Sequence, residues 1–191
     1  MKEIPLTRGY VALVDDADFE RVNAHKWQAK VYKRRTGSVY IYAMRSVRKN
    51  GKRTTELLHR FLNEGCGGLF VDHIDGNGLN NTRLNMRVCT NAENLRNSNS
   101  SCGTSKYKGV TWHKQKKMWC SHIRVDRKLK HLGCFKSETD AALAYNAAAL
   151  VLFGEYSRIN NVESENFDGQ TPEWAVQACL EAEAKRTGGN A

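Results

Sequence analysis

Residues 71–77 have the sequence Val71-Asp72-His73-Ile74-Asp75-Gly76-Asn77, in which an acid and a histidine follow an apolar residue. Turn-forming residues come next, so Asp72 and His73 are expected at the end of a strand. Residues 86–89 are long enough for the returning strand. Thr90 and Glu93 then have the spacing of a capping box, which starts a helix. The predicted order is therefore strand, loop, strand and helix.

The side chains of this segment supply the chemistry of phosphodiester hydrolysis. Asn94 falls within about the first turn of the predicted helix, and it reaches Asp72 if that helix packs across the two strands. Hydrolysis needs a base that takes a proton from water and a hard cation that stabilises charge on the phosphate. His73 offers the base, and Asp72 and Asn94 offer oxygen ligands. The segment predicts a metal-dependent nuclease.

This part of the chain resembles the HNH endonuclease family, specifically the homing enzymes of phages and mobile introns. The resemblance covers about half the chain and is carried by residues 58–62, 71–77, 80–81, 85–87 and 91–96. It implies the ββα-metal fold, with His73 as general base and Asp72 and Asn94 as ligands of one Mg²⁺ or Mn²⁺ ion. It also implies that Asn85 braces the loop and orients the base. The implied products carry a 5′ phosphate and a 3′ hydroxyl.

Two positions in this region leave alternatives open. Many family members have histidine where this chain has Asn94, and an amide oxygen is a harder ligand that favours Mg²⁺ or Mn²⁺ over zinc. His59 lies on a predicted helix whose apolar residues face another side, and either steadies the phosphate or makes a structural hydrogen bond. Asp75 is interpreted as a turn residue rather than a supporting carboxylate.

The charge of the chain favours a polyanionic partner. The 191 residues carry a net charge of +10, with an isoelectric point near 9.4. Residues 1–100 have 17 basic and 10 acidic side chains, residues 101–161 have 11 and 4, and residues 162–191 have 2 and 6. The first two regions are therefore expected to face a polyanion, and the third is not. Charge alone does not separate DNA from RNA or an acidic membrane, and it is the resemblance to a DNA endonuclease that implies double-stranded DNA.

Residues 21–55 contain 11 basic residues and no acid, interleaved with Tyr32, Tyr40 and Tyr42. Residues 39–44 have the composition of a strand, and Asn50-Gly51 is a pair typical of a tight hairpin turn. Because no acid compensates these charges, a phosphate-binding hairpin is favoured over a merely solvated sheet face. Before it, a strand or hairpin over residues 4–14 and a short helix capped by Asp16 or Asp18 and running through Trp27 are expected.

Residues 97–105 are rich in Asn and Ser and have the composition of a linker. Three segments with strand-like alternation follow, at residues 107–112, 118–125 and 128–135. An Ala-rich helix is expected from residue 141 to Phe153, with a cap near Ser137 and an end at Gly154. Small side chains allow that helix to lie close on one face of a three-stranded sheet.

Residues 105–161 resemble an AP2 (ERF-type) DNA-binding domain, through residues 107–110, 119–124, 132–135, 141–146 and 154–160. The resemblance implies that the sheet enters the major groove. The implied DNA contacts are Lys108, Thr111, His113, His122 and Arg124, followed by Lys128, Lys130 and His131. Several arginines typical of the first strand in plant members are missing here, so no target sequence is carried over.

The remaining features set the class of protein. Six cysteines occur without Cys-x-x-Cys spacing, which predicts reduced thiols and makes a structural zinc site improbable; they are Cys66, Cys89, Cys102, Cys120, Cys134 and Cys179. The chain has no signal-peptide pattern and no apolar run of the roughly 20 residues that span a bilayer. An intracellular protein of phage or mobile-element origin is expected, with no membrane association and no small-molecule organic cofactor.

These observations predict an α+β protein of four parts. They are a basic β-rich region at 1–56, an HNH core at 57–101, an AP2-like domain at 102–161, and an acidic helix and tail at 162–191. The leading hypothesis is a DNA endonuclease of the homing type, directed to its site by the AP2-like domain. The alternatives are a non-catalytic DNA-binding regulator derived from an HNH enzyme, which ranks second, and an RNA-processing nuclease. The sequence leaves the oligomeric state open.

Overall fold

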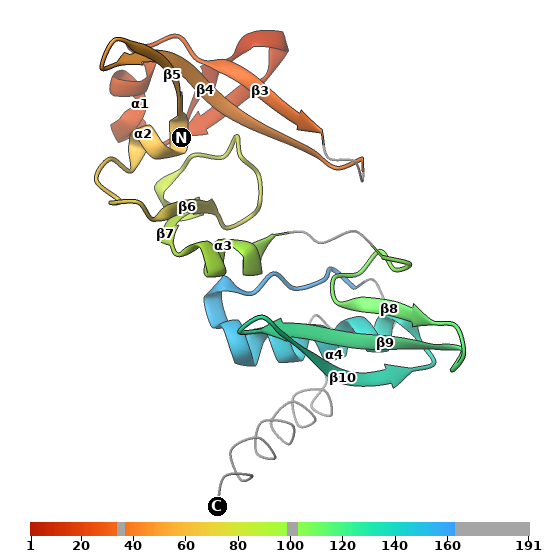
Figure 1. Ribbon diagram of the computed structural model, residues 1–191. Helices are drawn as coiled ribbons and strands as arrows, with labels where there is room; N and C mark the ends of the chain where they lie inside the picture. Colours follow the sequence, from red (N-terminus) through yellow and green to blue (C-terminus); the bar gives the residue numbers. More distant parts are fainter. Residues whose placement is uncertain (34–36, 99–102, 163–191) are drawn as a thin grey trace, which may run out of the picture. The chain divides into compact units, whose positions relative to one another are not determined.

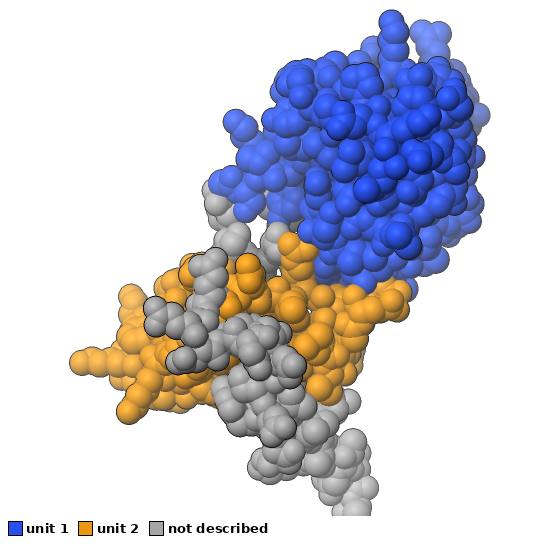
Figure 2. Space-filling model, turned by 180° about the vertical axis from the view of Figure 1, so that it is seen from behind, with its two compact units in different colours: residues 1–97 blue, residues 98–191 orange. Residues whose placement is uncertain are grey.

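The computed structural model describes residues 1–33, 37–98 and 103–162. The chain forms two compact units, Met1–Asn97 and Ser98–Ala191, which Figure 2 shows in different colours. The first unit combines small antiparallel sheets with short helices, and the second combines one antiparallel sheet with a longer helix, so the class is α+β. The predicted acidic helix and tail at 162–191 lie outside the described residues, apart from residue 162. Within the described part of the chain, no helix is both long enough and apolar enough to cross a membrane.

The chain begins with a hairpin and a helix. Strands β1 (Lys2–Pro5) and β2 (Val11–Val14) pair antiparallel, and α1 (Asp16–Asn23) follows directly. The helix ends before Trp27, contrary to the sequence-based expectation, and the Trp27 indole nitrogen instead donates to the Val22 carbonyl across 2.9 Å. Trp27 is thereby fixed in the core of the unit.

The basic segment contains the predicted hairpin, formed by β4 (Val39–Lys49) and β5 (Lys52–Leu57). An additional strand, β3 (Gln28–Lys33), pairs with β4 and gives a sheet in the order β3-β4-β5. Asn50 and Gly51 both have positive φ, as the tight turn requires. The charge of this hairpin is partly compensated, because Glu56 on β5 pairs with Arg45 at 2.7 Å and with Lys49 at 3.1 Å. Arg45 also stacks on the Phe61 ring, which gives it a structural role.

The motif segment has the predicted order of strand, loop, strand and helix. After α2 (Leu58–Leu62), strand β6 (Phe70–His73) pairs antiparallel with β7 (Met86–Cys89), and α3 (Asn91–Asn97) follows and packs on β6. Figure 1 shows this hairpin and helix below the sheet of β3 to β5, within the first unit. The capping box is present, because Thr90 N–H donates to Glu93 Oε2 and Glu93 N–H donates to Thr90 Oγ1.

The first hairpin and α1 brace the loop between β6 and β7. The N–H of Leu13 donates to the Leu79 carbonyl and the N–H of Asn81 donates to the Leu13 carbonyl, both across 2.8 Å. The Arg83 guanidinium makes two hydrogen bonds to the buried carboxylate of Asp18 on α1, at 2.7 and 2.9 Å. Residues 1–56 are therefore not separate from the motif segment but belong to the same unit.

The second unit contains a three-stranded antiparallel sheet and one long helix. The strands β8 (Val110–His113), β9 (Met118–Val125) and β10 (Lys128–Phe135) lie in the order β10-β9-β8. Helix α4 (Glu138–Phe153) packs along all three, as Figure 1 shows. Ser137 caps α4 by accepting from the N–H groups of residues 139 and 140, and the helix ends before Gly154 as predicted.

Small residues let α4 approach the sheet closely. Ala141, Ala142 and Ala148 are fully buried, and the Tyr145 ring lies so near Gly109 that an added Cβ there would fall 2.0 Å from the ring. Asn160 then closes the unit, because its amide bonds to both backbone groups of Lys108 and its own backbone bonds to the Asn146 side chain.

The expectation that the thiols are reduced is wrong for two of them. Cys120 on β9 and Cys134 on β10 are directly paired and form a disulfide bond. A bulge between His131 and Gly133 shifts the register of β10 and brings Cys134 opposite Cys120. Cys66 and Cys89 are free, and the other two cysteines lie outside the described residues.

Candidate functional site

Asp72 and His73 occupy the end of β6, and both side chains are buried, with 8% and 5% of their surface exposed. Successive residues of a strand point to opposite faces. Asp72 accordingly contacts Arg87 of β7 and Asn97 of α3, whereas His73 lies against Tyr42, His59 and Asn81. The two candidate groups thus have separate surroundings.

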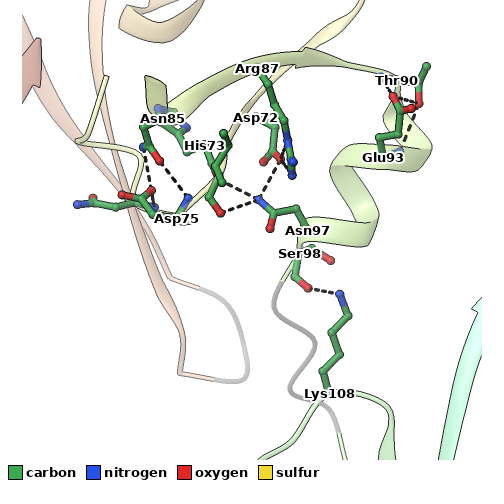
Figure 3. Close-up of polar contacts among 12 residues, drawn as sticks. Asp72, His73, Asp75, Asn85, Arg87, Thr90, Glu93, Asn97, Ser98 and Lys108 are labelled. Carbon is green, nitrogen blue, oxygen red and sulfur yellow. Dashed lines mark hydrogen bonds and ion pairs between the residues drawn. The ribbon is translucent and has the colours of Figure 1, made fainter. Parts of the chain in front are cut away.

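The carboxylate of Asp72 is held through one oxygen. Oδ2 accepts from Arg87 Nη2 at 2.9 Å, from Arg87 Nε at 3.2 Å and from Asn97 Nδ2 at 2.9 Å, as Figure 3 shows. Arg87 and Asp72 are both largely buried, which makes their ion pair less screened than one at the surface. Oδ1 receives no hydrogen bond from the residues that the structure describes.

Helix α3 reaches Asp72 through Asn97 rather than through Asn94. The Nδ2 atom of Asn97 lies 2.9 Å from both Asp72 Oδ2 and the His73 carbonyl oxygen, and 3.3 Å from the Ile74 carbonyl oxygen. Asn94 is half-buried, and its backbone N–H donates to the Thr90 carbonyl within the helix. Because Asn94 precedes Asn97 by three residues, the two side chains lie on the same face of α3, one turn apart.

Asn85 spans the loop that follows β6, also seen in Figure 3. Its Oδ1 accepts from the Asp75 N–H at 3.1 Å, and its Nδ2 donates to Asp75 Oδ1 at 2.9 Å and to the Asn80 carbonyl at 2.8 Å. Asp75 also accepts from the Asn77 N–H and from Asn80 Nδ2. Burial opposes ionisation of Asp75, but these hydrogen bonds hold its pKa below the ordinary value. Asp75 is thus engaged in the turn, where its carboxylate holds the loop closed.

His73 is held in one tautomer by Asn81, which is fully buried. His73 Nε2 lies 3.3 Å from Asn81 Oδ1, and Asn81 Nδ2 faces the Gly78 carbonyl at 3.5 Å, which assigns the amide orientation. An oxygen acceptor requires the proton to sit on Nε2, so Nδ1 carries the free electron pair. Burial lowers the pKa of His73, against the opposing effects of Asn81, Asp75 and Asp72. A neutral imidazole is the state suited to a base.

A cluster of aromatic rings supports His73. The His59 ring lies edge-on to the His73 ring with centroids 4.9 Å apart, and the Tyr42 ring contacts both, at 5.7 and 6.0 Å. Gly78 packs against Tyr42 so closely that a Cβ would fall 2.5 Å from the ring. His59 is buried, rather than turned away from the apolar face of α2, and burial first, then His73 and Arg60, lower its pKa to about 3.

In the second unit, strand register assigns the predicted DNA contacts to faces of the sheet. Trp119, Ile123 and Val125 of β9 pack toward α4, so Cys120, His122 and Arg124 lie on the face that α4 leaves free. Directly paired residues share a face, and this adds three more predicted contacts to the free face; they are Thr111, His113 and His131.

Three predicted contacts lie elsewhere. Lys128 pairs with Val125 and Lys130 with Ile123, which puts both lysines on the α4 side of the sheet. Lys108 precedes β8, and its Nζ donates to the Ser98 carbonyl at 2.7 Å. Burial, and then the nearby Arg158, lower the pKa of Lys108 to about 8. The Lys108 side chain therefore bonds to the backbone of the segment that precedes the sheet, and it does not extend from the sheet face.

Sequence reasoning assigned no role to Arg87, Asn81 or Tyr42, although each contacts a candidate residue. Arg87 and Asn81 lie inside the stretches that carry the HNH resemblance, but only the strand pairing and the loop closure show what they touch. Tyr42 comes from a distant strand, and no signal in the sequence connects it with His73.

The chain is similar to three curated proteins. It is 34% identical over 114 residues to an uncharacterized HNH endonuclease of Acanthamoeba polyphaga mimivirus, covering 56% of this chain and 58% of that protein. It is 37% identical over 62 residues to protein 3.8 of Escherichia phage T7, covering 32% of this chain and 51% of that protein. It is 37% identical over 98 residues to an AP2-like ethylene-responsive transcription factor of Arabidopsis thaliana, covering 50% of this chain and 16% of that protein.

In each case the chain spans less than two thirds of the relative's own length. No model of a known protein family matches the sequence.

Proposed function

We propose that the protein is a metal-dependent DNA endonuclease whose first unit cuts and whose second unit binds the target DNA. The observation that carries this proposal is the convergence of α3 and β7 on Asp72 beside a buried, neutral His73. Similarity to an HNH endonuclease supports a nuclease function in general, and similarity to an AP2-like factor suggests the combination of the two modules.

His73 is the proposed general base. With its proton on Nε2 held by Asn81, Nδ1 is the atom that accepts a proton from the attacking water. General-base catalysis of this kind contributes about 10²–10⁴-fold in typical enzymes. The aromatic contacts of Tyr42 and His59 restrict rotation of the ring, so the base is oriented before substrate binds. Asn85 contributes by closing the loop that follows His73.

The donor set around Asp72 fits a hard divalent cation. Asp72 Oδ1 receives no hydrogen bond from the described residues, and the amide side chains of Asn94 and Asn97 lie on the α3 face that packs on β6. Carboxylate and amide oxygens are ligands that Mg²⁺ and Mn²⁺ prefer. We assign Asp72 and Asn94 as the ligands and Asn97 as the residue that fixes the carboxylate. When bound, the cation stabilises the negative charge that develops on the phosphate and on the leaving oxygen.

The second unit is proposed to supply target selection. Cleavage sites that contact mainly phosphate and sugar select little sequence by themselves. The free face of the β8–β10 sheet carries Thr111, His122 and Arg124, side chains that can hydrogen-bond base edges. A DNA-binding unit on the same chain raises the local concentration of the nuclease at its site. This arrangement suits a homing endonuclease.

The test is cleavage of supercoiled DNA by purified protein in the presence of Mg²⁺ or Mn²⁺. We expect metal-dependent cutting that His73→Ala abolishes, whereas His25→Ala, at an exposed histidine of the same unit, retains it. DNA binding without cutting under any of these conditions would instead support the non-catalytic regulator.

A further inference from the structure

The free face of the second sheet carries two cysteines and two histidines next to one another. Cys120 and Cys134 are cross-strand partners on β9 and β10, and His122 and His131 are the neighbouring partners on the same strands. The two imidazole rings have centroids 5.0 Å apart. The nuclease mechanism proposed above uses neither cysteine, so the cluster needs an explanation of its own.

The distances within the cluster match those of a metal centre. His131 Nε2 lies 3.7 Å from Cys134 Sγ. Zinc binds sulfur at about 2.3 Å and nitrogen at about 2.0–2.1 Å in a tetrahedron, which separates two such ligand atoms by about 3.6 Å. One sulfur and one nitrogen therefore already have the separation of two ligands of a single ion.

The remaining nitrogen of His131 has the partner that metal-bound histidines require. His131 Nδ1 lies 3.3 Å from His122 Nε2. Histidine ligands almost always donate their second N–H to an acceptor, which fixes the ring and its tautomer. His122 Nε2 is therefore placed to accept the proton on His131 Nδ1, which leaves His131 Nε2 free to bind a metal ion.

We propose that reduction of the Cys120–Cys134 disulfide creates a site for Zn²⁺, with both thiolates and His131 Nε2 as ligands and His122 as the acceptor for the Nδ1 proton. Thiolate ligands favour zinc over Mg²⁺. Three protein ligands leave a fourth position for water or an outside ligand, as in zinc sites that exchange ligands. The sequence argument against zinc relied on Cys-x-x-Cys spacing, whereas these ligands converge across two strands.

Formation of the zinc site begins with a two-electron reduction of the Cys120–Cys134 disulfide. A thiol reductant transfers two electrons and two protons to the disulfide, which becomes two thiols, while the reductant leaves as its own disulfide. Zinc binding then displaces the two thiol protons into solution. In the oxidised state that the structure shows, the described residues contain no group of three or more histidine, cysteine or acidic side chains that could hold a metal. Only reduction frees the two sulfur ligands.

Cobalt binding to the full chain tests this proposal. The protein for this experiment is a variant in which serine replaces the other four cysteines, so that Cys120 and Cys134 are the only thiols. It is reduced in the absence of oxygen. We expect Co²⁺ to give the thiolate charge-transfer and tetrahedral ligand-field bands at one equivalent, and Zn²⁺ to remove them. The same protein with its disulfide intact is the control and should give neither band. Because the two samples differ only in the oxidation state of Cys120 and Cys134, a folding defect of the variant cannot account for the difference.

Substitutions then identify the ligands. Cys134→Ser and His131→Gln should abolish the tetrahedral signal, and His122→Gln should weaken metal affinity about 10–100-fold, the range for residues that orient a ligand. Lys130→Gln, next to His131 but on the other side of the sheet, should leave affinity unchanged. A reduced protein without the cobalt bands, or with bands that survive Cys134→Ser, would overturn the proposal. Neither result bears on DNA cleavage by the first unit.

Discussion

The side-chain nitrogen of Asn97 lies 2.9 Å from Oδ2 of Asp72 and joins the last residue of α3 to the end of β6. The same nitrogen lies 2.9 Å from the carbonyl oxygen of His73. One buried amide therefore connects the helix to the carboxylate and to the backbone of the candidate base. The effect of that amide on stability can be separated from metal binding.

Asn97→Ala is expected to destabilise the first unit by about 1.5–3 kcal/mol, because a buried carboxylate loses a hydrogen-bond donor. Asn94→Ala is the matched variant, one turn earlier on the same helix face, and should change stability by less than about 0.5 kcal/mol while weakening Mn²⁺ binding. Urea unfolding measures the first effect and calorimetric titration with Mn²⁺ the second. Equal losses of stability in the two variants would contradict the assignment of separate roles.

Arg87→Gln removes the positive charge that compensates Asp72. Breaking a buried ion pair from one side costs about 3–5 kcal/mol, and the lower end is expected here because Asn97 still donates to the carboxylate. Added Mn²⁺ should restore part of the lost stability by supplying a positive charge. Lys49→Gln, which breaks an ion pair with a largely exposed lysine, should cost no more than about 1 kcal/mol. Thermal unfolding with and without Mn²⁺ measures both variants.

Asn81→Ala should remove the hydrogen bond that keeps the proton of His73 on Nε2. The proton is then free to occupy Nδ1, so kcat is expected to fall while KM for DNA changes little. Nitrogen NMR of the imidazole should show one tautomer in the parent protein and a mixture in the variant. Asn77→Ala, in the exposed part of the same loop, provides the comparison. A single unchanged tautomer in Asn81→Ala would show that another group positions the proton.

Acid should destabilise the first unit through His59. Its pKa is about 3 in the folded protein, against about 6.5 in the unfolded chain, so the unfolded state binds a proton first as the pH falls. Stability is therefore lost below about pH 6.5 and continues to fall toward pH 3, by up to about 1.4 kcal/mol per pH unit. Urea unfolding between pH 7 and pH 4 should show a shallower decline in His59→Gln. The exposed His25→Gln should retain the steep decline.

In the second unit, side chains on the free face of the β8–β10 sheet should contribute more to DNA affinity than side chains on the α4 side. Arg124→Ala removes an exposed charge from that face, whereas Lys128→Ala removes one from the α4 side of the same sheet. Fluorescence anisotropy at several salt concentrations should show weaker binding and a smaller salt dependence for Arg124→Ala than for Lys128→Ala. Identical behaviour of the two variants would remove the basis for choosing the free face.

Local signals in the sequence predicted the elements well, because those signals act over a few residues. The capping box at Thr90 and Glu93, the turn at Asn50-Gly51 and the helix end at Gly154 are all present in the structure. Each depends on backbone groups within one turn, so no tertiary information is needed. The helix expected through Trp27 ends at Asn23, and the Trp27 side chain packs into the core beyond it, a tertiary contact that the local sequence does not encode.

The contacts within the candidate site depend on tertiary packing and could not be predicted from the sequence. Asn94 and Asn97 share a helix face, and only the seating of α3 on β6 decides which of them touches Asp72. The pairing of Cys120 with Cys134 likewise depends on the bulge after His131, which interrupts the alternation expected for residues 128–135. The assignments of the metal ligands and DNA contacts stay predictions.

Asn160 links two segments of the second unit that are far apart in the sequence. Its side chain holds the backbone of Lys108, just before β8, while the adjoining residues carry Val162 into the same core as Tyr107. One amide therefore fastens the segment before β8 to the segment after α4, so a change at this single position should loosen both segments at once.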